Sequence, residues 1–306
     1  MEAASKGSID VVRCLAEECG ANVDLASGSG TTAVMLAAQS GHLDVVRYLA
    51  VKCRANVNAT DKSGDTVVMK AASHGHCHVA RFLVVDDEAG LNVTALAKAV
   101  AKGSFDDVRF LAEECRVDTS ATDISGATPL MTAAQHGRIL IVRYLVVECK
   151  AGVNAADKYG DTPLTKSAAN GHFDVVRTLA SEYGADVRAV NNNGTTPLMQ
   201  AAQYGHIDVV RYLAGDHAVD VTAADISGTN ALMIAAQYGH ISVVRYLAGD
   251  CGVDANATNS TRTTALMIAT QYGNMDVVRY LVKQCRANVT RTDIPLYVLL
   301  LSAVTK

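Results

Sequence analysis

The chain has 306 residues, of which 49% are apolar and 19% are charged, and this composition excludes a disordered protein. A formal net charge of −4 argues against a general nucleic-acid-binding protein. No stretch reaches the roughly 18 apolar residues that a membrane span needs, and the first residues lack the apolar core of a signal peptide. We therefore expect a cytoplasmic or nuclear protein that has no membrane span.

One sequence unit recurs along the chain, and each copy carries a glycine that we call its marker glycine. The spacing between neighbouring markers is 34 residues except from Gly75 to Gly103, where it is 28. A fixed period of this length indicates a solenoid, in which each unit buries its apolar face only against its neighbours. The marker glycines are Gly7, Gly41, Gly75, Gly103, Gly137, Gly171, Gly205, Gly239 and Gly273.

We interpret residues 1–306 as one continuous array. Its approximate units are 1–27 (partial), 28–61, 62–90, 91–123, 124–157, 158–191, 192–225, 226–259 and 260–293, followed by an apolar partial helix at 294–306.

Each unit predicts the same order of elements. A stretch such as Ala55–Gly64 mixes one Val with turn-forming residues and predicts an extended finger with a tight turn. Next, Thr128 and Pro129 open a first helix, since Thr caps the free amides and Pro suits the first helical position. The marker glycine ends this helix, because glycine reaches the left-handed conformation without steric cost. The second helix carries an apolar stripe such as Val209, Val210 and Leu213.

The recurring stretch before each marker glycine is similar to a known repeat. Residues 126–135 read Gly-Ala-Thr-Pro-Leu-Met-Thr-Ala-Ala-Gln, and residues 194–203 read Gly-Thr-Thr-Pro-Leu-Met-Gln-Ala-Ala-Gln. With the Gly-His pair and the apolar second helix that follow, this pattern resembles the ankyrin repeat family over nearly the whole chain. The resemblance implies an all-α repeat solenoid of stacked helix-turn-helix units with short β-hairpin-like fingers, and a protein-binding role without catalysis or cofactors.

The chain departs from the family pattern in two ways. The family unit has about 33 residues, so this unit carries one more, most simply at the end of the second helix. Methionine also replaces the family's histidine after Pro-Leu, so we expect any hydrogen bond between repeats that this histidine makes to be absent. These methionines are Met35, Met69, Met131, Met199, Met233 and Met267.

Several side chains that could carry chemistry have a repeat-based explanation. Six cysteines share one repeat position, where neighbouring copies should lie about 8–10 Å apart, too far for a disulfide; we interpret them, and Cys14, as structural. The cluster of His74, His76, Cys77 and His78 could hold a metal, but the repeat places these residues on different elements. We expect no metal site.

Each second helix carries one arginine. These arginines either recognise an acidic partner or form a solvated face in which each pairs with an Asp three residues earlier, and we favour the solvated face.

The family resemblance places the partner-binding surface on one concave face, formed by the finger tips and the exposed side of the first helices. Tyr204, Tyr238 and Tyr272 stand 34 residues apart and would form an aromatic row that either anchors a partner or packs against the adjacent finger. The candidate finger-tip residues are Lys62, Asp65, Ile124, Lys158, Tyr159, Asp161, Asn192 and Ile226, and the candidate helix-end residues are Gln135, His136, Gln203, Tyr204, Gln237, Tyr238, Gln271 and Tyr272.

The shortened spacing places a deletion in the finger at 85–93, after which Thr94 should still open the first helix. That finger either admits a partner element or is a tolerated deletion. We expect a non-enzymatic scaffold that binds other proteins, of unknown identity and in an unknown oligomeric state. The alternative is a targeting or autoinhibitory arm of a larger multidomain enzyme, receptor or channel.

Overall fold

The computed structural model describes residues 1–85, 91–114, 116–216 and 219–288. Part of the predicted short finger and the predicted terminal helix at 294–306 lie outside these ranges. Every regular element within them is helical, which confirms the all-α repeat fold. None of the helices in these ranges combines the length and the apolar character that crossing a membrane would demand.

The chain divides into two compact units: unit 1 contains Met1–Ala133 and Leu140–Ala151, and unit 2 contains Ala134–Ile139 and Gly152–Lys306. The interpretation of 1–306 as one array stays a prediction.

In unit 1 the first helices are α1 (Glu2–Ser5), α3 (Ala33–Gln39), α5 (Val67–Ser73) and α7 (Leu91–Lys102). The second helices are α2 (Ile9–Arg13), α4 (Leu43–Arg47), α6 (Cys77–Val85), α8 (Phe105–Glu113) and α10 (Ile139–Val147). Two π-helical turns are η1 (Cys14–Glu18) and η2 (Tyr48–Lys52).

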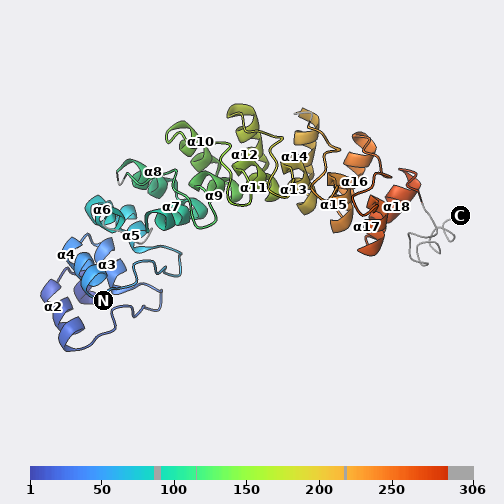
Figure 1. The fold of residues 1–306 in the computed structure, drawn as a ribbon. Helices are drawn as coiled ribbons and strands as arrows, with labels where there is room; N and C mark the ends of the chain where they lie inside the picture. The colour runs from blue at the N-terminus through green and yellow to red at the C-terminus, as the bar shows by residue number, and fades with distance from the viewer. Residues whose placement is uncertain (86–90, 115, 217–218, 289–306) are drawn as a thin grey trace. The chain divides into compact units, whose positions relative to one another are not determined.

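Unit 2 repeats the same plan, with its first helices packed side by side in one layer and its second helices in another (Figure 1). The helix α9 (Pro129–Gln135) reaches both units. The first helices are α11 (Pro163–Ala169), α13 (Pro197–Tyr204), α15 (Ala231–Tyr238) and α17 (Ala265–Gln271); the second helices are α12 (Phe173–Arg177), α14 (Ile207–Arg211), α16 (Ile241–Arg245) and α18 (Met275–Lys283); and the π-helical turns are η3 (Thr178–Glu182), η4 (Tyr212–Asp216) and η5 (Tyr246–Asp250).

First helices such as α13 begin as predicted. The Thr196 hydroxyl accepts a hydrogen bond from the Met199 backbone N–H at 3.2 Å, and Pro197 is the first helical residue. The methionine adds a contact that the sequence did not suggest, because its Sδ accepts from the Thr196 backbone N–H at 3.5 Å. Cap and methionine thus satisfy two amides reciprocally, as in a capping box.

The marker glycines end the first helices as predicted. Their φ angles lie between 67° and 84°, in the left-handed region where other residues are strained. The same residues allow a close approach between repeats. A Cβ on Gly41 would lie 2.6 Å from Nδ1 of His76, and one on Gly205 would lie 2.5 Å from Nδ1 of His240.

Five second helices of the described residues, α2, α4, α12, α14 and α16, run into a π-helical turn, at the place where the additional residue of a unit was expected. The backbone N–H of Cys53 donates to the carbonyl of Tyr48, five residues earlier, at 3.2 Å, and Cys251 donates to Tyr246 at 2.9 Å. A π-turn holds one residue more than an α-turn of the same rise. The next residue then takes a positive φ even where it is not glycine, as in Arg54 after η2.

The buried core matches the predicted pattern of apolar positions. The alanine pairs of first helices such as α13 are buried, as in Ala201 and Ala202, and so are the valine pairs of second helices such as α14, as in Val209 and Val210. Small first-helix side chains let neighbouring first helices approach closely, and the branched valines fill the space behind them.

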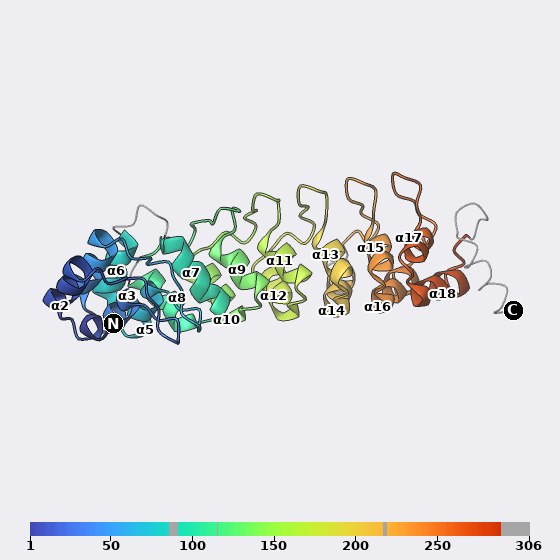
Figure 2. The same cartoon turned by 90° about the horizontal axis from the view of Figure 1, so that it is seen from below.

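Two expectations need revision. The helix α7 begins at Leu91, so Thr94 lies inside the helix rather than at its start; residues 91–93 contain no Gly or Pro that would prevent the earlier start. The predicted β-hairpin-like fingers are not confirmed. The described finger residues form turns, with two isolated bridges, Ala224 to Asn230 and Thr258 to Thr264, instead of paired strands. Figure 2 shows these loops of unit 2 standing on one side of its first helices.

Candidate partner-binding surface

The finger turns are held by an acceptor side chain at their start. In unit 1, Oδ1 of Asp61 accepts from the backbone N–H groups of Ser63 and Asp65 at 2.8 and 2.9 Å. In unit 2, Asp157 does the same for Tyr159 and Asp161 at 2.9 Å each. Such turns present the residues at the tip to solvent.

Neighbouring fingers in unit 2 are also tied to one another. The backbone N–H of Asn192 donates to the carbonyl of Tyr159 at 2.9 Å, and the Asn192 side-chain Nδ2 donates to the carbonyl of Lys158 at 2.8 Å. The backbone N–H of Ile226 likewise donates to the carbonyl of Asn193 at 3.0 Å. The predicted tip residues of unit 2 therefore form a connected row.

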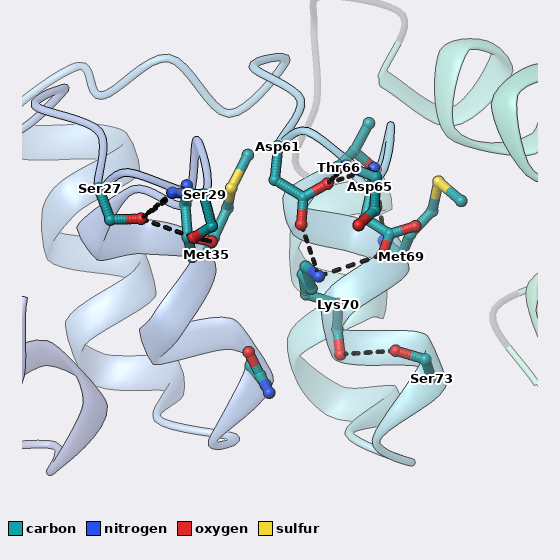
Figure 3. Close-up of polar contacts among 12 residues, drawn as sticks. Ser27, Ser29, Met35, Asp61, Asp65, Thr66, Met69, Lys70 and Ser73 are labelled. Atoms are coloured by element: carbon teal, nitrogen blue, oxygen red, sulfur yellow. Dashed lines mark hydrogen bonds and ion pairs between the residues drawn. The ribbon is translucent and has the colours of Figure 1, made fainter.

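In unit 1, a lysine lies behind the finger that carries Lys62 and Asp65. Nζ of Lys70 lies 2.7 Å from Oδ2 of Asp61 and 3.1 Å from Oδ2 of Asp65 (Figure 3). The second lysine on this site is Lys102 of α7, which pairs with Oδ1 of Asp65. We call Asp61, Asp65, Lys70 and Lys102 cluster A.

Unit 2 holds a second copy of this arrangement. Nζ of Lys166 lies 2.9 Å from Oδ2 of Asp157 and 2.9 Å from Oδ2 of Asp161. Oδ1 of Asp161 accepts from Nδ2 of Asn191 at 3.0 Å. We call Asp157, Asp161 and Lys166 cluster B.

The buried carboxylates of the two clusters are held in their charged form. Burial alone would raise the pKa of Asp157, but the Lys166 ammonium and the backbone N–H groups of Asp161 and Tyr159 outweigh it and lower this pKa below its usual range. The balance at Asp61 is the same, with Lys70 as the cation, and it lowers the pKa of Asp61. The pKa of Lys166 is raised, because the two carboxylates outweigh its own burial.

A hollow of about 610 Å³ opens beside cluster B. It brings together three predicted site residues, Gln135, Asp161 and Tyr204, and shows that the sequence-based choice missed Lys166 and Gln200. The missed signal was the lysine that follows Asp161 by five residues, a spacing that Asp65 and Lys70 repeat. The residues lining the hollow are Gln135, Asp161, Thr165, Lys166, Ala169, Asn170, Gln200, Tyr204 and His206.

The three tyrosines of the predicted row lie at the ends of consecutive first helices of unit 2. Tyr204, Tyr238 and Tyr272 are 54%, 50% and 55% exposed. Each hydroxyl after the first is reached by a glutamine of the preceding repeat: Nε2 of Gln203 lies 3.5 Å from the Tyr238 hydroxyl, and Nε2 of Gln237 lies 3.4 Å from the Tyr272 hydroxyl. The predicted glutamines thus position the predicted tyrosines.

Large apolar side chains also stand exposed at finger tips. Ile124 in unit 1 is 94% exposed, and Ile226 and Tyr159 in unit 2 are 76% and 63% exposed. Of the remaining predicted residues, Gln135, His136 and Gln271 are exposed, and Asp65 and Asp161 are half-buried by their ion pairs.

The arginines of the second helices have a structural role that the sequence did not reveal. The guanidinium of Arg211 lies over the ring of Tyr246 at 5.4 Å, and that of Arg245 lies over Tyr280 at 5.6 Å. In other repeats a phenylalanine packs edge-on against the tyrosine ring, as Phe173 does against Tyr212. The arginine of that second helix then pairs with the Asp three residues earlier, and Arg177 lies 3.8 Å from Asp174. The predicted Asp–Arg pairing therefore holds for some repeats and not for others.

Among the cysteines whose side chains the structure describes, the free thiols are those of Cys14, Cys19, Cys53, Cys149, Cys251 and Cys285. Burial raises the pKa of the Cys149, Cys251 and Cys285 thiols, which fits a packed structural role. Cys14 and Cys19 are exposed, so burial does not support the predicted structural role at these two positions. The Cys14 thiol donates to Oε2 of Glu18 at 3.6 Å.

The histidines near the third marker glycine turn to different partners. His78 contacts the carbonyl of Gly41 through Nε2 at 3.1 Å, and His74 contacts the carbonyl of Lys70 through Nδ1 at 3.0 Å. In the described part of the chain, no three His, Cys, Asp or Glu side chains come together in a way that could hold a metal ion.

A comparison with protein-family models identifies the repeat. A model described as ankyrin repeats (3 copies) matches residues 1–95, 85–157, 147–225 and 219–293. No curated protein matches the chain in sequence.

Proposed function

This chain belongs to the ankyrin repeat family, and we propose that it is a non-enzymatic scaffold that binds partner proteins along its finger tips and first-helix ends. Ankyrin repeats are generally protein–protein interaction modules. The finer assignment of the binding face to the residues of unit 2 is our proposal. The exposed row of Tyr204, Tyr238 and Tyr272 is the observation that carries it.

The physical character of this row supports an interface. A tyrosine offers a large contact area with few rotatable bonds to immobilise, and tyrosines are enriched among residues that dominate binding energy. Gln203 and Gln237 contact the next tyrosine in the row, so part of the entropy of ordering these rings is already lost before a partner binds.

The predicted residues from Asn192 to Tyr272 also indicate the kind of partner surface. The set consists of tyrosine, glutamine, asparagine and isoleucine, and none of its members carries a formal charge. An uncharged, partly apolar partner surface would complement this stretch, with amide groups supplying hydrogen bonds at its rim. Because this stretch carries no positive charge that would attract phosphates, we propose a protein partner and not a nucleic acid. From the sequence we also propose a cytoplasmic or nuclear location.

The test uses the full chain as bait for crosslinking and mass spectrometry in native extract. We expect the triple variant Tyr204→Ala, Tyr238→Ala, Tyr272→Ala to lose the crosslinked partners while it keeps the helical circular dichroism of the wild type. Leu140→Ala is the matched control, because Leu140 is an exposed apolar residue on a second helix. Equal capture by the wild type and the triple variant would remove the tyrosine row from the binding face.

A further inference from the structure

The two lysine clusters provide an internal comparison. Clusters A and B share two aspartates that flank a finger turn and one lysine of the following first helix, placed between the carboxylates. Asp65 and Asp161 occupy the same position, directly after the finger glycines Gly64 and Gly160. The clusters differ in what reaches this aspartate from the next repeat.

In cluster A, the next repeat supplies a second cation. Lys102 is the last residue of α7, directly before the marker glycine Gly103, and its ammonium pairs with Oδ1 of Asp65. Cluster A therefore contains two carboxylates and two ammonium groups, and its charges balance.

In cluster B, the equivalent position is Tyr204, the last residue of α13, directly before the marker glycine Gly205. Two carboxylates face one ammonium group, which leaves one unbalanced negative charge. Oδ1 of Asp161 accepts from the neutral Asn191 amide, and a carboxylate oxygen has a further lone pair. The hollow of about 610 Å³ lies here, between Asp161 and Tyr204.

We infer that this hollow binds a lysine side chain of the partner protein, whose ammonium group takes the place at Asp161 that Lys102 takes at Asp65. The inference rests on the proposed function and deepens it by naming the chemistry of one anchor. It makes Asp161, Tyr204, Asn170 and Gln200 a subsite for a cation at one end of the uncharged row.

The lining of the hollow suits such a side chain. The Asp161 carboxylate supplies the opposite charge, and the side-chain oxygens of Asn170 and Gln200 can accept from the remaining ammonium protons. The Tyr204 ring, which stacks on His206 with ring centroids 6.4 Å apart, lines the same hollow, and an aromatic ring can contact both the apolar stem and the cation. An anionic ligand would meet the excess negative charge of cluster B and is disfavoured.

The first experiment measures binding of a defined probe by nuclear magnetic resonance. The probe is a blocked pentapeptide with a central lysine among alanines, and its control has norleucine in place of the lysine. We expect the lysine peptide to shift the side-chain amide signals of Asn170 and Gln200 saturably, with an affinity at least about tenfold above that of the norleucine peptide. Asp161→Asn should abolish this difference. Equal shifts with both peptides, or shifts with neither, would overturn the inference.

The second experiment exchanges the equivalent residues of the two clusters. Tyr204→Lys places a lysine of the chain itself beside Asp161, and we expect it to abolish binding of the lysine peptide. Lys102→Tyr removes the resident cation of cluster A, and we expect this variant to gain a second binding site for the lysine peptide. Retained binding in a folded Tyr204→Lys variant would contradict the inference even if Asp161→Asn does not fold.

Failure of this inference can be told apart from failure of the proposed function. A partner whose crosslinking depends on Tyr238 and Tyr272 but not on Asp161 would leave the scaffold role intact and overturn the lysine subsite. If the three tyrosine substitutions leave crosslinking of the partner unchanged but the lysine peptide still binds, the proposed binding face is wrong and the lysine subsite remains.

Discussion

The imidazole ring of His206 lies so close to Gly171 that a Cβ on this glycine would come within 2.4 Å of Nδ1. The other ring nitrogen, Nε2, lies 3.0 Å from the carbonyl oxygen of Ala169. One histidine thus joins its own repeat to the preceding one through a hydrogen bond and a close contact. Asn274 takes this role in the last repeat, with Nδ2 donating to the carbonyl of Gln237 at 2.8 Å.

Replacing Gly171 by alanine should therefore destabilise the chain for two reasons. The residue has a φ of +70°, which costs an alanine about 1 kcal/mol, and the new methyl group would displace His206. Gly184→Ala is the matched control, since its φ is +67° and no atom lies within 4 Å of its Cβ position. We expect the Gly171 variant to lose about 1–3 kcal/mol more than the control in urea denaturation. Equal losses would show that the histidine contact contributes nothing.

Replacing Arg54 by glycine should stabilise the chain. Arg54 follows a π-helical turn and has a φ of 52°, a conformation that costs a residue with a Cβ about 1 kcal/mol. The same substitution at Lys52, inside that turn, should destabilise by about 1 kcal/mol, because glycine is a poor helix former. Thermal denaturation of both variants checks the opposite signs, and a lower melting temperature for Arg54→Gly would contradict the expectation.

The buried carboxylate of cluster B should make stability depend on acid pH. The pKa of Asp157 is lower in the folded chain than its unfolded value of about 3.9, so its contribution is fully present above that pH and is lost as pH falls through the folded pKa. At pH 6, Asp157→Asn should cost about 1–3 kcal/mol in the free energy of unfolding.

Denaturant titrations of wild type and Asp157→Asn at pH 6 and near pH 3 measure this effect, and the difference between the two proteins should shrink at the lower pH. Asp174→Asn, at an exposed ion pair, should cost less than about 0.5 kcal/mol at either pH. A gap between wild type and Asp157→Asn that widens in acid would refute the assigned ion pairs.

The arginines of the second helices should contribute unequally to stability. Arg245→Met removes a cation over the Tyr280 ring and should cost about 0.5–1 kcal/mol. Arg177→Met removes an exposed pair with Asp174 and should cost about 0.2–0.5 kcal/mol. Urea denaturation of both variants provides the comparison, and a larger loss at Arg177 would count against the stacking interaction.

The sequence predicted those features whose cause lies within one repeat. The cap at Thr196, the left-handed Gly205 and the buried pair Val209 and Val210 each follow from residues a few positions apart. In the five repeats that contain a π-helical turn, this turn lies where the additional residue was expected, at the end of the second helix, although its π form was not predicted.

Features that join two repeats were harder to predict. The partner of His206 is a backbone carbonyl, which any residue supplies, so no side chain in the sequence points to it. The stacking of Arg245 depends on the Tyr280 ring, 35 residues later. Arg177 instead pairs with Asp174, because Phe173 already packs against the equivalent ring, that of Tyr212. Lys166 was missed because its carboxylate partners lie five and nine residues earlier and meet it only through the finger turn.

The histidine contact has a consequence for how such a chain can grow. A repeat whose marker glycine is followed by histidine, as at His206 and His240, carries both the imidazole that reaches back and a carbonyl that can receive the next one, so a copy of such a repeat already fits at its two boundaries. A tandem gene duplication of 34 codons would insert without refitting either neighbour. The match between residues 198–216 and 232–250, which differ only at Gln200 and Asp208, is what such an event leaves behind.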